Sequence, residues 1–229
     1  MSFRQQPGLS ALFRAIDEHD DQLVGRLLEA GADCDARSSV PPLWTPLGAA
    51  IEELECGGSI STIRRLLEAG ASVNAVYIGD TLTPLHAALH TENQSVVELL
   101  LDWGADPCAV SEEDQSPLLF AVEQRLHGIA ELLLEYGAER TIDLTGGFTA
   151  HTALATAARN ADAAMVRLLL QAGADLSATD SDGYTAVDHL HTAQRLSDAA
   201  FRAVSDLLSD RERVAPGTPK IDPGHKVGG

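Results

Sequence analysis

The stretch RLLEAGA at residues 26–32 is repeated without change at residues 65–71. Three similar stretches contain Gly104, Gly137 and Gly173, which correspond to Gly31 and Gly70 of the two identical copies. Consecutive glycines of this set lie 39, 34, 33 and 36 residues apart. A repeat of this length is typical of solenoids, in which small units stack in a row and bury their apolar faces against each other. The sequence therefore predicts one elongated repeat domain.

Each unit begins with a hydroxyl residue, and in three units proline follows it directly. A serine or threonine side chain can accept a hydrogen bond from a free N–H group in the first turn of a helix, and proline is favoured at the first helical position. In the first five units the repeat glycine can adopt the left-handed conformation that closes the second helix. Each unit is therefore predicted to contain two short helices, of which the second ends before the glycine. The hydroxyl residues are Ser10, Thr45, Thr83, Ser116, Thr152 and Thr185.

This pattern resembles the ankyrin repeat over about residues 8–210. The clearest match is TPLHAA at residues 83–88, followed by LLL at residues 99–101 and GAD at residues 104–106. The resemblance implies an all-α repeat solenoid, an ankyrin-repeat stack of helix–turn–helix units with β-turn fingers. It divides the domain, residues 1–210, into six units at about 8–40, 41–78, 79–111, 112–147, 148–180 and 181–210. Residues 211–229 are rich in proline and glycine and are predicted to form a flexible tail.

The spacing of the units is irregular in three places. The second unit has four additional residues between its helices, around residues 55–61. The fingers around residues 36–44 and 140–151 are also longer than the shortest finger, and they carry Trp44 and Phe148. Insertions in loops often lie on a binding face. We expect these two fingers to contribute to binding, with packing of each aromatic ring on its neighbouring finger as the alternative.

The chain is strongly acidic, with 34 acidic residues, 16 basic residues and a net charge of −18. This charge argues against binding to nucleic acids and to anionic membranes, and it favours a basic partner. The alternative is a solvated acidic surface without a binding role. The three cysteines lack metal-binding spacing and are expected to be ordinary thiols. Because we find neither a membrane-spanning apolar run nor a signal peptide, we expect a cytoplasmic protein. We also expect a monomer.

No residues form a recognisable catalytic, cofactor-binding or metal-binding motif. The histidines are scattered among the units, and the Gly-Gly pairs lack the strand-then-helix context of a phosphate-binding loop. Serine and cysteine residues are not found in a nucleophile elbow. We therefore expect a protein that is not an enzyme and holds no cofactor or metal ion.

The resemblance implies that a partner binds to the concave face formed by the finger tips and the exposed ends of the first helices. Counting from the hydroxyl residues places mainly acidic side chains on this face. The candidate binding residues, aromatic ones included, are Asp17, Glu18, Trp44, Glu52, Glu53, Tyr77, Asp80, Glu112, Glu113, Asp114, Glu123 and Phe148. The resulting hypothesis is a non-enzymatic module that binds a basic protein, such as a stoichiometric inhibitor or an immunity-type protein.

Three other hypotheses remain open. The chain could be an adaptor or scaffold that recruits short basic peptides, which would bind weakly and in many variants. An enzyme would need a deep polar pocket that contains perturbed carboxylates. A cation site in the acidic strip would make thermal unfolding depend on calcium.

Overall fold

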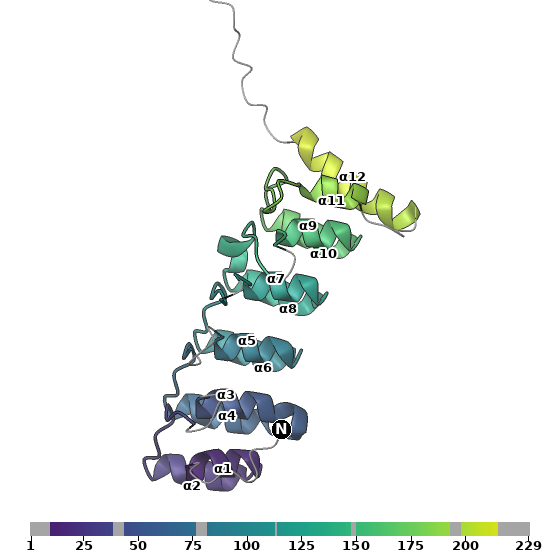
Figure 1. The fold of residues 1–229 in the computed structure, drawn as a ribbon. Helices are drawn as coiled ribbons and strands as arrows, with labels where there is room; N and C mark the ends of the chain where they lie inside the picture. Colours follow the sequence, from purple (N-terminus) through teal and green to yellow (C-terminus); the bar gives the residue numbers. More distant parts are fainter. Residues whose placement is uncertain are drawn as a thin grey trace, which may run out of the picture.

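The computed structural model describes residues 10–38, 44–76, 82–112, 114–147, 150–192 and 198–214. Pairs of antiparallel helices stack in one column, from α1 and α2 at one end to α11 and α12 at the other (Figure 1). Within the described part of the chain, the only β-type pairing is an isolated bridge between Gly146 and His151. The predicted all-α solenoid is therefore confirmed.

The helices of each pair have nearly constant lengths. The first helices have seven residues each and are α1 (Ala11–Asp17), α3 (Pro46–Glu52), α5 (Pro84–His90), α7 (Pro117–Glu123), α9 (Ala153–Arg159) and α11 (Ala186–Thr192). The second helices are α2 (Asp21–Glu29), α4 (Ile60–Glu68), α6 (Gln94–Asp102), α8 (His127–Glu135), α10 (Ala163–Gln171) and the longer α12 (Asp198–Val214). Since α12 continues to Val214, it includes the first four residues of the predicted tail, which begins at residue 211.

Each predicted hydroxyl residue directly precedes a first helix, but not all of them cap it in the same way. The side chains of Thr45, Ser116 and Thr152 accept hydrogen bonds from backbone N–H groups three residues later, at 3.1–3.2 Å. Thr83 forms a reciprocal capping box with His86. Ser10 makes no side-chain cap bond, so the predicted capping is wrong at this first position.

The core runs through the whole stack. The largest fully buried side chains alternate between first and second helices, as in Leu47, Leu66, Leu85 and Leu100. Each helix pair thus buries its apolar faces against the pairs above and below, as expected for a solenoid. Among the described residues, no helix is long and apolar enough to cross a bilayer.

Two short 3-10 helices account for two of the irregular spacings. The first, η1 (Glu53–Cys56), extends α3 into the insertion of the second unit and ends at Gly57, which has a φ of 103°. The second, η2 (Ala138–Thr141), lies in the long finger after α8. Both insertions are therefore ordered within the described residues.

Hydrogen bonds between successive fingers fix the spacing of several repeats. In each of these bonds, a side-chain oxygen of one finger accepts a backbone N–H of the next finger at 2.8–2.9 Å. The donor is always two positions after the repeat glycine. The bonds join Asp35 to Ser72, Asn74 to Asp106, and Asp143 to Asp175.

Candidate protein-binding surface

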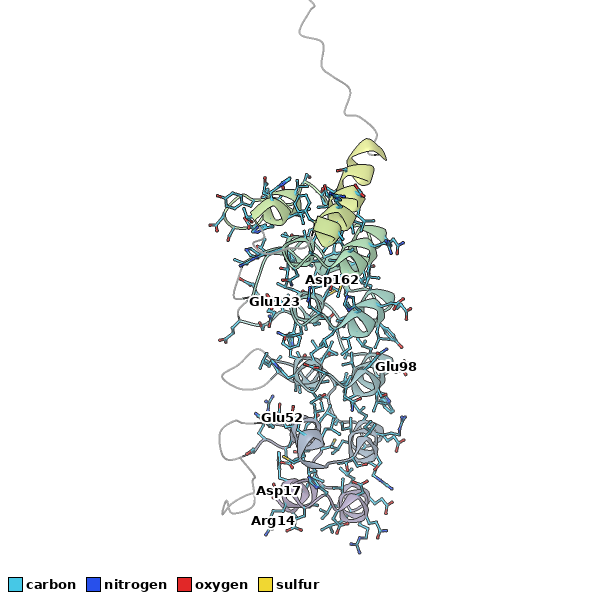
Figure 2. The ribbon with its side chains drawn as sticks, turned by 90° about the vertical axis from the view of Figure 1, so that its right-hand side faces the viewer. Arg14, Asp17, Glu52, Glu98, Glu123 and Asp162 are labelled. Carbon is cyan, nitrogen blue, oxygen red and sulfur yellow. The ribbon has the colours of Figure 1, made fainter. Side chains whose placement is uncertain are left out.

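Three carboxylates lie at the same position of three different repeats. Asp17, Glu52 and Glu123 are the last residues of α1, α3 and α7. Figure 2 shows them along the side of the stack formed by the first helices. Glu98, on the second helix α6, lies on the opposite side. We call the three carboxylates the acidic strip.

Glu52 and Glu123 are held in surroundings that disfavour their negative charge. Burial raises the pKa of Glu52, and the charges of Glu55 and Glu53 raise it further. Burial also raises the pKa of Glu123, although a hydrogen bond of 2.6 Å from Gln115 opposes this effect. Both residues are at helix C-termini, where the helix dipole favours cations. The fold itself therefore does not stabilise these two charges.

The other predicted residues of the first-helix ends differ in exposure. Asp17 is only 5 % exposed, whereas Glu18 is exposed to solvent. Glu53 is buried and lies 3.1 Å from Nε2 of His19. Glu53 therefore connects the first two helix pairs, and only Glu18 of these residues presents a fully exposed charge.

The equivalent positions in the other helix pairs interrupt the acidic strip. His90 ends α5, and its ring packs edge-on against Phe120 with a centroid distance of 4.7 Å. Arg159 ends α9 and is exposed. The charge along this side is therefore acidic at α1, α3 and α7, and mixed elsewhere.

Two predicted acidic residues of the finger between α6 and α7 are exposed. Glu112 and Asp114 both face solvent, and Asp114 has a φ of 53°, in the left-handed region that favours glycine. Trp44 is half-buried and packs against the core. The remaining predicted binding residues, Tyr77, Asp80, Glu113 and Phe148, lie outside the described residues.

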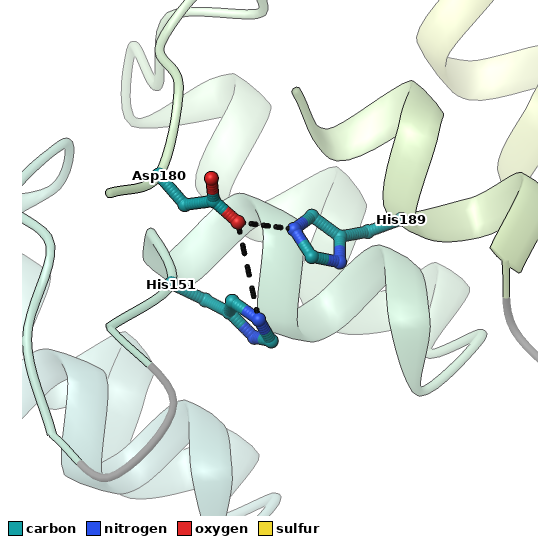
Figure 3. Close-up of side chains that lie close together, drawn as sticks. All are labelled: His151, Asp180 and His189. Atoms are coloured by element: carbon teal, nitrogen blue, oxygen red, sulfur yellow. Dashed lines mark hydrogen bonds and ion pairs between the residues drawn. The ribbon is translucent and has the colours of Figure 1, made fainter. Parts of the chain in front are cut away.

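The structure also brings together three residues that the sequence analysis did not combine. His151 is at the end of the long finger, Asp180 lies in the next finger, and His189 lies on α11 (Figure 3). Burial lowers the pKa of His151, and the nearby charges of His189 and Arg159 lower it further. The separations of these residues in sequence do not match the repeat length, so the periodicity of the sequence does not indicate that they lie together.

A pairing at the repeat length could have been found from the sequence. His127 Nε2 lies 2.9 Å from Asp162, and the two residues are 35 positions apart. Burial alone would raise the pKa of Asp162, but hydrogen bonds from His127 and from the N–H of Met165 outweigh it and keep the pKa low. Such His–carboxylate pairs stabilise the contact between neighbouring repeats.

Comparison with known families agrees with this architecture. Residues 55–145 match a family model described as ankyrin repeats in three copies, and residues 133–190 match one described as ankyrin repeats in many copies. The chain belongs to the ankyrin-repeat family. The resemblance rests on the repeat glycines and on the Ser-Pro or Thr-Pro pairs at the helix starts.

Several curated proteins are similar to parts of this chain. ARF GTPase-activating protein GIT1 of Homo sapiens is 34 % identical over 84 residues, which is 37 % of this chain and 11 % of GIT1. Ankyrin repeat and SOCS box protein 5 of Bos taurus is 36 % identical over 110 residues, covering 47 % of this chain and 30 % of that protein. This ankyrin-repeat protein thus corresponds to a small part of the length of these relatives.

Two solved structures share the fold over most of the chain. The ankyrin-repeat protein EF0377 superposes with a TM-score of 0.72 at 23 % identity, covering 89 % of this chain and 98 % of its own. A chain from the complex of Bd0816, a predatory endopeptidase of Bdellovibrio bacteriovorus, with the immunity protein Bd3460 gives a TM-score of 0.70 at 24 % identity. That match covers 87 % of this chain and 99 % of the other. At these identities the likeness concerns the fold alone.

Proposed function

We propose that this ankyrin-repeat protein is a non-enzymatic module that binds a basic protein through the acidic strip and the adjoining finger residues. The complex has one copy of each protein, and binding inhibits the partner, as an immunity protein would. The observation that carries the proposal is the pair Glu52 and Glu123, two half-buried carboxylates at helix C-termini.

A cationic partner removes an unfavourable electrostatic free energy that the free protein bears. Each of the two carboxylates is partly desolvated and faces the negative end of a helix dipole. A lysine or arginine of the partner placed against them supplies the missing opposite charge. The net charge of −18 attracts a basic protein over longer distances and speeds its association, most strongly at low salt.

Two further points support a binding role. Ankyrin repeats are protein-interaction modules, and one solved structure with this fold comes from a complex with an immunity protein. The stack is held by hydrogen bonds between fingers, so the face is presented by a preorganised frame. Preorganisation lowers the entropy that binding costs.

An adaptor that recruits basic peptides is the second candidate, because exposed carboxylates lie at two separate places along the stack: Glu18 at the end of α1, and Glu112 with Asp114 in the finger before α7. Separate exposed carboxylates suit an extended basic peptide. One-to-one binding that abolishes the partner's activity supports the inhibitor, whereas weak binding to many short basic peptides supports the adaptor.

The test uses the full chain as bait in a lysate of the source cell at low salt, followed by binding measurements with the purified partner. The double variant Glu52→Gln, Glu123→Gln is expected to bind at least about tenfold more weakly and with a shallower dependence on salt. The matched control is Glu98→Gln, Glu131→Gln, which removes two exposed charges from the second helices. We expect the control to bind within about twofold of the unchanged chain.

Two results would contradict the proposal. Equal losses in both double variants would mean that overall charge, and not the acidic strip, governs binding. Retention of full affinity by the strip variant would mean that the partner binds elsewhere.

A further inference from the structure

Three side chains that can bind metal ions meet at the end of the stack opposite the first helix pair (Figure 3). Nε2 of His189 lies 2.6 Å from Oδ2 of Asp180, and Nε2 of His151 lies 3.9 Å from the same oxygen. The ligand atoms of all three residues lie within 4.8 Å of one another. The proposed binding face does not use this cluster.

The carboxylate of Asp180 is fixed in an orientation that suits a ligand. Its Oδ1 atom accepts the backbone N–H groups of Asp182 and Tyr184, both at 2.9 Å. These bonds use one oxygen and direct Oδ2 towards the two imidazoles. Hydrogen bonds that orient the ligands in this way are a regular feature of metal sites in proteins.

The cluster is largely shielded from solvent but remains partly accessible to it. The side chain of Asp180 is 1 % exposed, and those of His151 and His189 are 12 % and 10 % exposed. The rings of the two histidines lie side by side, with a centroid distance of 4.2 Å, and Tyr184 packs edge-on against His189. The partly exposed imidazoles allow an ion to enter and a water molecule to complete its coordination.

We propose that His151, Asp180 and His189 form a binding site for a divalent transition-metal ion of the zinc type. Tetrahedral zinc with Zn–N bonds of about 2.0–2.1 Å separates its ligand atoms by roughly 3.4 Å. The observed separations of 2.6 and 3.9 Å from Asp180 lie on either side of that value, and all three ligand atoms lie within 4.8 Å of one another. Shifts of less than about 1 Å by each ligand therefore suffice. Two imidazoles favour zinc, cobalt or nickel over calcium and magnesium, which prefer oxygen ligands.

The bound ion connects parts of the chain that are far apart in sequence. His151 directly precedes Thr152, which caps α9, and His189 lies on α11. The helices α9 and α11 are neighbours in the stack. The ion therefore fastens the C-terminal helices to the rest of the solenoid, and its binding stabilises the folded chain.

The test is a calorimetric titration of the tag-free full chain with zinc chloride after treatment with a chelator. We expect one equivalent to bind with a Kd of about 1 µM or tighter. At a hundredfold excess over Kd, the midpoint of thermal unfolding should rise by about 5–10 °C. The same concentration of magnesium chloride should leave it unchanged.

The decisive variant is His151→Gln, which removes one imidazole and leaves the His189–Asp180 hydrogen bond in place. It is expected to weaken zinc binding at least about tenfold and to remove the visible absorption of the cobalt-loaded protein. The matched control is His127→Gln, since His127 pairs with Asp162 in an exposed setting and should not affect binding. Unchanged zinc affinity in His151→Gln, equal loss in His127→Gln, or equal stabilisation by magnesium would overturn the proposal.

Discussion

At the scale of single residues, Glu123 combines several unfavourable features. It ends a short helix, it is half-buried, and its pKa is raised by that burial. Among the described residues, its Oε1 atom is buried and has no hydrogen-bond partner. A carboxylate in such a place reduces the free energy of unfolding at neutral pH, so its presence agrees with a role in binding.

We predict that Glu123→Gln stabilises the protein at pH 7 by about 1–3 °C in thermal unfolding. The folded state holds the Glu123 proton more tightly than the unfolded chain, so stability falls as pH rises from the usual glutamate pKa through the raised value. The gain should therefore be present above this window and vanish below it. Thermal unfolding from pH 3 to pH 8 measures this dependence.

The control for this prediction is Glu98→Gln, which removes an exposed carboxylate from α6. We expect less than about 0.5 kcal/mol from it at any pH. A loss of stability in Glu123→Gln at neutral pH would show that the charge is favourable in the folded state.

At the scale of elements, the long finger after α8 is held close to the preceding finger. A Cβ atom on Gly146 would lie 1.9 Å from the carbonyl oxygen of Asp114, which belongs to the backbone and cannot turn away. Gly128 in α8 has a different neighbour, since its Cβ would meet only the flexible end of Gln94. The same substitution should therefore have opposite effects at the two glycines.

We predict that Gly146→Ala destabilises the protein by about 1–3 kcal/mol, because the two fingers must move apart. Gly128→Ala should be neutral or stabilise by up to about 1 kcal/mol, because alanine favours the helix. Urea unfolding of the two variants measures both values. Equal stability of the two variants would mean that the fingers separate without cost.

At the scale of the whole molecule, the stack depends on contacts between neighbouring repeats. The side chain of Asn74 donates to the carbonyl of Gly104 and accepts the N–H of Asp106, both at 2.9 Å. It therefore joins two successive fingers. In a solenoid such interfaces decide whether the chain unfolds as one unit.

We predict that Asn74→Ala destabilises the protein by about 1–2 kcal/mol and also reduces the m value of urea unfolding, since the two sides of the interface become less cooperative. The matched control is Asn93→Ala, which removes a cap bond to Ser95 within a single helix pair. The control should lower the midpoint of unfolding and keep the m value. If both variants keep the m value of the unchanged chain, Asn74 does not couple the repeats.

The sequence by itself determined the architecture of the repeats. The RLLEAGA stretches, the hydroxyl residues and the repeat glycines predict helix starts and ends because capping and helix termination depend on neighbouring residues. It also predicted the positions of the acidic strip, since equal spacing places equivalent residues on one side of a stack. At Ser10 the missing cap bond is a departure from this local rule.

Only the tertiary structure decided which of these residues carry unusual chemistry. The burial of Glu52 and Glu123 and the meeting of His151, Asp180 and His189 depend on how one repeat packs against the next. Burial and contacts between distant residues arise only when the repeats stack. Local sequence patterns therefore do not predict them.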